Sequence, residues 1–360
     1  MDTNIYSVIT GTGSHVPSER VPNEDFFDRQ FYDAKGDRIR RDGKEIVEKF
    51  EAITTIKERR YVPDHLVTSD IAYLAAKEAI ASAKTNKEEL DYIILAHNFG
   101  DVKHCNRRSD MVPTLAARVK YKLGISNPYT VAYDLPFGCP GWLQAVIQAN
   151  YFIKSGDARK ILVIGAEVLS RVCDPHDRDS MLYADGAGAV VLEAKNSTNP
   201  VGILAHKTRS DTLNHSHMLY MGTSYDSASN GQDPIYLKMN GRKLYQYALE
   251  KVPGAIKNCL DETGISHTQI KKLLIHQANG KMDEAILTRF YGQYEENQIP
   301  GNIMPMTVSC LGNSSVATIP TLLDLIMKGN LQPHEISGGD VLVFASVGAG
   351  MNINAMVYRA

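Results

Sequence analysis

Short apolar runs alternate with amphipathic segments along most of the chain. The segments Tyr92–Ala96 and Ile161–Gly165 are apolar throughout, which is typical of strands buried on both faces of a sheet. After Ser69, apolar residues recur at helical spacing, and we expect Ser69 to cap that helix. The same patterns predict further strands at 5–10, 129–135, 185–192 and 272–276, helices at 140–154, 240–263 and 280–291, and a final hairpin at 341–358.

Glycine-rich, charged and polar stretches separate these elements. Turns are expected at Gly11–Gly13 and at 185–188. The highly charged stretch 31–49 is expected to be a surface insertion, and another helix is expected to start at Asn313. The polar, turn-rich stretch Lys195–Pro200 is the best linker, so we divide the chain into halves at 1–196 and 197–360. Strands alternate with helices in both halves, which predicts α/β layers with largely parallel strands and is compatible with a duplicated fold.

Composition and charge narrow the classes of protein. The 360 residues include 39 Lys or Arg and 41 Asp or Glu, and a net charge of −2 argues against non-specific nucleic-acid binding. No apolar stretch approaches the ~18 residues of a membrane span, and we expect no secretory signal at the start. The five cysteines include no CxxC pair, which argues against a disulfide framework or structural zinc and favours reduced thiols in the cytoplasm.

Several familiar cofactor and nucleophile motifs are missing from the sequence. Gly11–Gly13 lacks the third glycine of a dinucleotide fingerprint, and there is neither a GxxxxGK[ST] phosphate loop nor a GxSxG elbow. His215 and His217 could bind a metal as a pair, but no third ligand lies nearby, and we interpret them as loop residues. We therefore expect neither a metal nor a cofactor.

Cys139 is the first candidate for covalent chemistry. It lies between an expected strand and a helix, and Pro140 suits the first helical turn because that turn needs no amide donor. A thiol at a helix N-terminus has its pKa lowered by the positive end of the helix dipole, which favours the thiolate. Gly138 and Gly141 leave room for an acyl group beside the sulfur. The alternative is a small buried hydrophobe.

His276 and Asn313 are the second and third candidates. His276 ends an apolar run, and Asn313 follows Gly312, so each is expected at a strand end or turn. Their N–H groups could stabilise a developing oxyanion, although a structural histidine and a helix cap are the alternatives. Papain-like proteases share the Cys–His–Asn order, but their nucleophile lies near the mature N-terminus in a different local sequence. The order therefore does not make this chain a protease.

Taken together, these segments resemble β-ketoacyl-acyl-carrier-protein synthase III, a condensing enzyme of the thiolase superfamily. The resemblance runs from near residue 5 to the C-terminus and is strongest over 133–192 and 271–320. It rests on the motifs around the three candidates and on Lys154–Asp157, Cys173–Arg178, Asp185–Gly188, His276–Asn279 and Gly312–Pro320. It implies a thiolase-like fold with two βαβαβαββ halves in five layers, α-β-α-β-α, and a homodimer.

The resemblance also implies residue roles. Cys139 would take the acyl group from a donor thioester. His276 and Asn313 would hold the thioester carbonyl of a malonyl-carrier protein and stabilise the enolate that forms as carbon dioxide leaves. The backbone amides of Cys139 and Ala349 would form the oxyanion hole for acyl transfer. Further expected contacts are the acyl pocket at Phe137, Trp142, Met111 and Val112, the last two as a floor for the neighbouring subunit, and the carrier-protein surface at Lys281 and Arg107.

The sequence departs from the family at the site that clamps the adenine of coenzyme A. Lys49 and Ile53 stand where the family has a Trp and an Arg, and only Phe50 remains as a stacking face. This departure puts coenzyme A in doubt as the acyl donor and favours an acyl-carrier protein, while the sequence leaves the choice between the two donors open. The departure also suggests a specialised relative that joins two acyl thioesters with ring closure to a dialkylresorcinol-type product. A non-catalytic partner subunit is disfavoured because Cys139 is intact.

Overall fold

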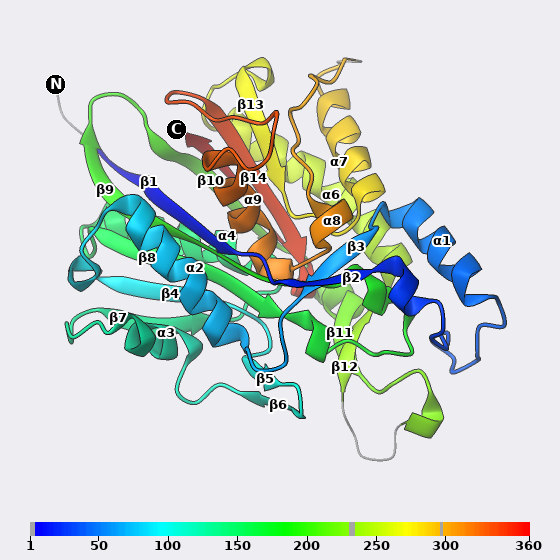
Figure 1. Cartoon of the computed structure of the whole chain (residues 1–360). Coiled ribbons are helices and arrows are strands. Elements are labelled where there is room, and N and C mark those ends of the chain that lie inside the picture. Colours follow the sequence, from blue (N-terminus) through cyan, green and yellow to red (C-terminus); the bar gives the residue numbers. More distant parts are fainter. Residues whose placement is uncertain (1–3, 230–234, 296–297) are drawn as a thin grey trace.

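The computed structural model describes the chain except for residues 1–3, 230–234 and 296–297 (Figure 1). Its larger sheet has five strands in the order β1-β9-β8-β4-β7. Their bounds are Asn4–His15, Asp185–Ser197, Lys160–Val168, Tyr92–Ala96 and Val131–Leu135. The second sheet has the order β10-β15-β14-β13, with bounds Gly202–Ser210, Asn352–Arg359, Val341–Gly348 and Ile270–Ile275.

Strand pairing is mixed rather than largely parallel. Strand β4 pairs parallel with both β7 and β8, and β13 pairs parallel with β14. Strands β9 and β15 return antiparallel to their neighbours, because each half ends in two strands joined without a crossover helix. Three two-stranded pairs lie outside the sheets: β2 with β3 (Glu19–Pro22, Glu58–Tyr61), β5 with β6 (Asp101–Lys103, Asn106–Asp110), and β11 with β12 (Leu219–Gly222, Tyr236–Met239).

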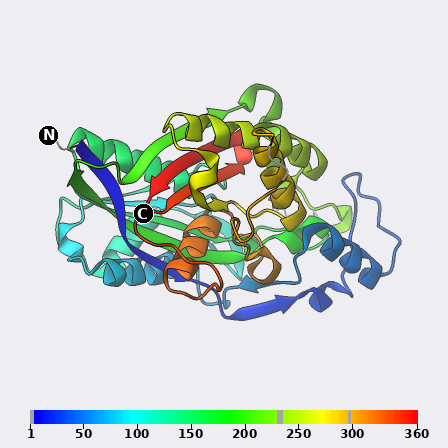
Figure 2. The ribbon, with the colours of Figure 1, turned by 90° about the horizontal axis from the view of Figure 1, so that it is seen from above.

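Helices and sheets stack in five layers, as the sequence predicted. Helices α4 (Gly141–Ser155) and α9 (Thr318–Met327) lie between the sheets and bury apolar side chains against both. Helices α2 (Thr68–Ala83) and α3 (Leu115–Leu123) cover the outer face of the larger sheet. Helices α6 (Gly241–Asp261) and α7 (Gly280–Gly292) cover the outer face of the other (Figures 1 and 2). The remaining α-helices are α1 (Gly43–Thr54), α5 (Thr212–His215) and α8 (Val308–Leu311).

The two halves differ in one strand. The first half follows the expected order, β1-α2-β4-α3-β7-α4-β8-β9. In the second half, the described residues between α7 and α9 form no regular strand. Residues 303–305 instead run beside the edge strand β13, where the Leu273 N–H donates to the Ile303 carbonyl at 2.9 Å. Pro305 has no N–H to continue such a ladder. The division at 196 and 197 stays a prediction.

Two glycine pairs expected in turns lie inside strands instead. Gly11 and Gly13 are part of β1, and Gly186 and Gly188 are part of β9. Their small size serves close packing, because a Cβ on Gly11 would lie 2.3 Å from the backbone nitrogen of Ala83 in α2. In these strands, glycine therefore marks the approach of a helix rather than a change of chain direction.

Two expected helix starts were also wrong. Helix α2 begins at Thr68, and the Asp70 carboxylate accepts from the Val67 N–H at 2.9 Å, so Ser69 is not the cap. Asn313 forms a bridge with Tyr183, and α9 begins only at Thr318. Ser69 uses its side chain for a distant partner, Asp101, and Asn313 is held by backbone hydrogen bonds to Leu182 and Ala184.

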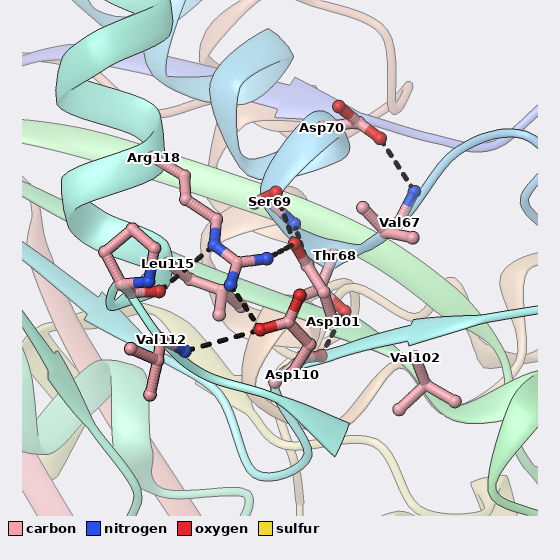
Figure 3. A network of polar contacts seen from close by, with 12 residues as sticks. Val67, Thr68, Ser69, Asp70, Asp101, Val102, Asp110, Val112, Leu115 and Arg118 are labelled. Carbon is pink, nitrogen blue, oxygen red and sulfur yellow. Dashed lines mark hydrogen bonds and ion pairs between the residues drawn. The ribbon is translucent and has the colours of Figure 1, made fainter. Parts of the chain in front are cut away.

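Ser69 belongs instead to a polar network that anchors the β5–β6 hairpin (Figure 3). The Asp101 carboxylate accepts from the Ser69 backbone and hydroxyl, each at 2.7 Å, and from Arg118 at 2.7 Å. Arg118 also donates to Asp110 at 2.6 Å and to the Pro113 carbonyl at 3.1 Å. A partly buried guanidinium thus joins α2, α3 and both strands of the hairpin.

Among the described residues, no helix is long and apolar enough to cross a bilayer.

Candidate active site

Cys139 lies in the turn between β7 and α4, and close packing fixes that turn. Gly138 has a φ of +67°, which favours glycine. Its N–H donates to the Asn98 side-chain oxygen at 2.9 Å. On the other side, a Cβ on Gly348 would lie 2.6 Å from the Cys139 nitrogen. The turn that carries Cys139, in the first half, therefore packs directly on the end of β14 in the second.

One cavity brings Cys139, His276 and Asn313 together. Its volume is about 230 Å³, and Ala349 also lines it. Asn98 and Ser315 also line it. Most of the remaining wall is apolar and includes Phe99, Leu169, Tyr183, Leu219, Leu237, Met239, Leu244, Met282 and Val347. Such a wall suits an acyl chain, and the polar groups gather around the sulfur.

The environment of the Cys139 thiol differs from the prediction. Burial raises its pKa to about 11, because removing water disfavours the charged thiolate. The Ser315 hydroxyl, which donates to the sulfur at 3.3 Å, acts in the opposite direction. The expectation of a lowered pKa from the helix N-terminus was therefore wrong. The resting group at neutral pH is a thiol.

His276 follows β13, and its backbone N–H donates to the Ala345 carbonyl at 2.9 Å. Burial lowers the pKa of its imidazole to about 4, so the ring is neutral at physiological pH. The Nδ1 atom is buried and makes no hydrogen bond to any other described residue. The ring therefore offers a neutral donor or acceptor to whatever occupies the cavity.

Asn313 is oriented by its own backbone and by Ser315. Its N–H donates to the Leu182 carbonyl at 2.9 Å, and its carbonyl accepts from the Ala184 N–H at 2.8 Å. Its side-chain oxygen accepts from the Ser315 N–H at 2.9 Å. Because the oxygen is already engaged, the Nδ2 donors are the part of the amide that is left for a ligand.

Ala349 lies in the turn between β14 and β15. The Asn352 side chain donates to its carbonyl at 2.9 Å and so fixes this peptide. Gly350 and Met351, rather than Ala349, have the positive φ values of the turn, so the Cβ of Ala349 causes no strain there. A Cβ on Gly138 would lie 2.9 Å from the Ala349 nitrogen, which places this amide beside the nucleophile turn.

The comparisons with known proteins agree with this arrangement. Family models for the N- and C-terminal parts of 3-oxoacyl-[acyl-carrier-protein] synthase III match residues 133–212 and 260–360. A β-ketoacyl-[acyl-carrier-protein] synthase III of Porphyra purpurea is 32% identical over 98% of both chains. The chain belongs to this family. It is therefore a condensing enzyme, an acyltransferase of the ketosynthase type, as the resemblance implied.

Other members of the family, and structures with the same fold, cover the whole chain. A synthase III of Halalkalibacterium halodurans is 31% identical over 98% of this chain and 97% of its own. The synthase III structure of Thermus thermophilus has 28% identity and a TM-score of 0.80, covering 98% and 99%. A priming ketosynthase from the R1128 polyketide pathway has a TM-score of 0.79 at 23% identity, a likeness of fold alone. The thiolase-like fold is therefore confirmed.

Two residues expected in the acyl pocket are placed elsewhere. Trp142 is 1% exposed, and its ring packs against Phe344 in the layer between the sheets, with ring centroids 6.4 Å apart. Trp142 is the second residue of α4, and its ring belongs to the apolar cluster that α4 buries between the two sheets. Phe137 is half-buried and is not part of the cavity wall.

The other expected contacts lie on the surface. Met111 and Val112 follow the β5–β6 hairpin and are 48% and 88% exposed, outside the cavity of their own chain. Lys281 is exposed at the start of α7. Arg107 is exposed on β6, with its guanidinium 5.1 Å from the Tyr236 ring. None of these four positions contradicts its expected role, and each role stays a prediction.

Sequence reasoning missed three polar residues behind the nucleophile: Asn98, Glu167 and Ser315. Ser315 lies inside a motif that carried the resemblance, two residues after Asn313. Asn98 directly follows the apolar strand β4, at a strand carboxyl end, and that position was a usable signal. Glu167 lies near the end of the buried strand β8, where a charged residue is unusual. The described residues contain no group of three metal-ligating side chains.

Proposed function

We propose that the chain joins an acyl thioester to a malonyl- or β-oxoacyl-carrier protein by a Claisen condensation, which is decarboxylative when the partner is malonyl, with Cys139 as the acyl carrier. The observation that supports this most is the shared cavity, in which a buried thiol meets the imidazole of His276 and the amide of Asn313. A covalent acyl-cysteine separates acyl transfer from carbon–carbon bond formation.

The charge state of the site suits the second half-reaction. Loss of carbon dioxide builds negative charge on a thioester oxygen, which neutral N–H donors stabilise without a full opposite charge. The neutral imidazole of His276 and the free Nδ2 of Asn313 are such donors. For the first half-reaction, the backbone N–H groups of Cys139 and Ala349 serve as the oxyanion hole. The carbanion then attacks the acyl-cysteine carbonyl, and the thiol is regenerated.

The acyl donor is an acyl-carrier protein rather than coenzyme A. Ile53 on α1 is 51% exposed and Lys49 lies exposed beside it, and neither presents an aromatic ring to an adenine. Phe50 is only 8% exposed and packs in a core cluster with Ile46 and Val47, so it offers no stacking face. Lys281 and Arg107 supply cationic groups for an acidic carrier protein.

The active form is a homodimer in which Met111 and Val112 reach the acyl pocket of the neighbouring subunit. The support is their high exposure on a segment that Arg118 and Asp101 hold in place (Figure 3). Exposed apolar side chains on an anchored hairpin are typical of a protein–protein contact. The cytoplasmic location stays a prediction.

The other functions considered are less well supported. Family membership over the whole chain opposes a papain-like protease, and the intact Cys139 in its cavity opposes a non-catalytic partner subunit. The comparisons favour the ketosynthase function over ring closure to a dialkylresorcinol-type product.

Intact-mass spectrometry tests the proposal directly. The protein is incubated with matched acyl-carrier-protein and acyl-CoA thioesters, and the acyl adduct is mapped by peptide analysis. We expect an adduct on Cys139 that Cys139→Ala abolishes and that Cys310→Ala, at an exposed thiol, leaves unchanged. Asn313→Ala should retain loading and lose decarboxylation. An unmodified Cys139 with every donor would overturn the nucleophile, whereas equal loading from acyl-CoA would overturn only the choice of donor.

A further inference from the structure

A chain of polar side chains runs from the buried interior to the Cys139 sulfur. The Glu167 carboxylate, fully buried, accepts from the Asn98 backbone N–H at 3.0 Å and from its Nδ2 at 2.6 Å. The Asn98 Nδ2 also donates to the Ser315 hydroxyl at 3.4 Å. The Ser315 hydroxyl donates to the Cys139 sulfur at 3.3 Å. Four residues from four separate segments thus form one connected network.

The direction of the donors in this network is fixed by Asn98. Its side-chain oxygen accepts from the Gly138 N–H at 2.9 Å, so its Nδ2 must be the atom that faces Glu167. Because that nitrogen has only protons to offer, the Ser315 oxygen must accept from it. A serine hydroxyl has a single proton, and the Ser315 hydroxyl donates that proton to the Cys139 sulfur.

Ser315 has a strained backbone at this point. Its φ is +53°, a left-handed conformation that costs energy for a residue with a Cβ. The same conformation lets its N–H bind the Asn313 side chain while its hydroxyl reaches the sulfur. Strain of this kind persists where the surrounding structure enforces it and is concentrated at functional sites. Both the nucleophile and the enolate-binding amide are therefore oriented by one residue.

We propose that Ser315 and Asn98 are positioning residues that activate Cys139: the Ser315 hydroxyl stabilises the thiolate, and Asn98, held by Glu167, keeps that hydroxyl aimed at the sulfur. This inference rests on the proposed role of Cys139 as the nucleophile. It adds residues that act before any substrate binds. Their effect is therefore measurable without an acyl donor.

The other titratable groups around the sulfur all lack a positive charge at neutral pH or repel the thiolate. Glu167 raises the pKa of Cys139 when charged. Burial raises the pKa of Tyr183 well above its ordinary value, so its phenol is neutral, and the neutral His276 on the cavity wall carries no compensating charge. The Ser315 side chain lowers the pKa of the Cys139 thiol. Removing its hydroxyl therefore leaves the thiolate without this stabilising contact.

The pH dependence of alkylation tests this role in the whole protein. The folded enzyme is treated with iodoacetamide between pH 7.5 and 10, and modification of Cys139 is followed by peptide mass spectrometry, because Cys105 and Cys310 are also exposed. A rise of one pKa unit reduces the thiolate about tenfold well below the pKa. We expect Ser315→Ala to slow alkylation of Cys139 about tenfold at pH 8.5 and to shift the profile to higher pH.

Three further variants keep the test decisive. Ser314→Ala removes the neighbouring hydroxyl, which faces Thr318 at 3.4 Å, and should leave the profile unchanged. Ser315→Gly also removes the hydroxyl but relieves the positive φ, so it should slow alkylation like Ser315→Ala while folding at least as well. Asn98→Ala should shift the profile in the same direction.

The opposite results have distinct meanings. If both Ser315 variants match Ser314→Ala in their alkylation profiles, the role of Ser315 is wrong. If Asn98→Ala lowers the melting temperature but leaves the profile of the folded protein unchanged, Asn98 is structural only. Failure of acyl loading with an altered alkylation profile would contradict the proposed function and leave this inference standing.

Discussion

Replacing Glu167 with glutamine should make the protein more stable, and the gain should grow with pH. Burial raises the pKa of this carboxyl from 4.5 to about 7, and the contacts with His97 and Asn98 oppose this only in part. The folded state therefore binds the proton more tightly than the unfolded state. The stability that protonation contributes is complete below pH 4.5 and is lost as the pH rises through the folded pKa.

The size of the effect follows from the two pKa values. A separation of about 2.5 units corresponds to about 3 kcal/mol, of which about 2 kcal/mol is lost between pH 5.5 and 8.5. Glutamine retains an acceptor oxygen for Asn98 but cannot ionise. The buried carboxyls of Asp179 and Asp185, whose pKa values are also raised, titrate in both proteins and cancel in the difference.

Denaturant unfolding at pH 5.5 and at pH 8.5 measures this difference. The stability of Glu167→Gln relative to the unmodified protein should increase by about 2 kcal/mol between the two conditions. The control is Glu48→Gln, at an exposed glutamate, and its stability relative to the unmodified protein should show no pH-dependent difference. Gln277→Glu is not a suitable control, because Gln277 lies in another buried network. A constant difference at both pH values would refute the raised pKa of Glu167.

Two further outcomes follow from the geometry of the cavity. Gly348→Ala would place a Cβ 2.6 Å from the Cys139 nitrogen, so we expect acyl loading to fall about a hundredfold in mass-spectrometric time courses, whereas Gly338→Ala, with nothing within 4 Å, should load normally. Because the pKa of His276 is about 4, decarboxylation by the Cys139→Ala variant should show no loss with an apparent pKa near 6.5, and such a step in a pH–rate profile would contradict the neutral imidazole.

Much of the fold was predictable because the pattern is local. The strand Tyr92–Ala96 has the predicted bounds, and α4, α6 and α7 each agree with their expected ranges to within two residues. In such segments the spacing of the buried apolar residues alone indicates the secondary structure. The roles of Gly11 and Ser69 were not predictable from local sequence, because they depend on partners distant in sequence, the backbone of Ala83 and the carboxylate of Asp101.

The candidate site, too, has features that the sequence predicted and features that it did not. Cys139, His276 and Asn313 lie in motifs specific enough to be found, and the cavity brings them together. The protonation state of the thiol was not predictable, because it depends on how completely the fold removes water from the sulfur. Trp142 was misplaced because nearness in sequence to the nucleophile does not say which face of α4 meets the core.

The contact between Ser315 and Cys139 spans 176 positions of the sequence and joins the two halves of the chain. During synthesis, the nucleophile emerges from the ribosome long before the strand ends and turns that complete its pocket. A nascent chain that has folded only its first sheet therefore carries a cysteine with neither its hydroxyl donor nor its oxyanion hole. With the roles proposed above, acyl capture by Cys139 requires almost the whole chain to have been made.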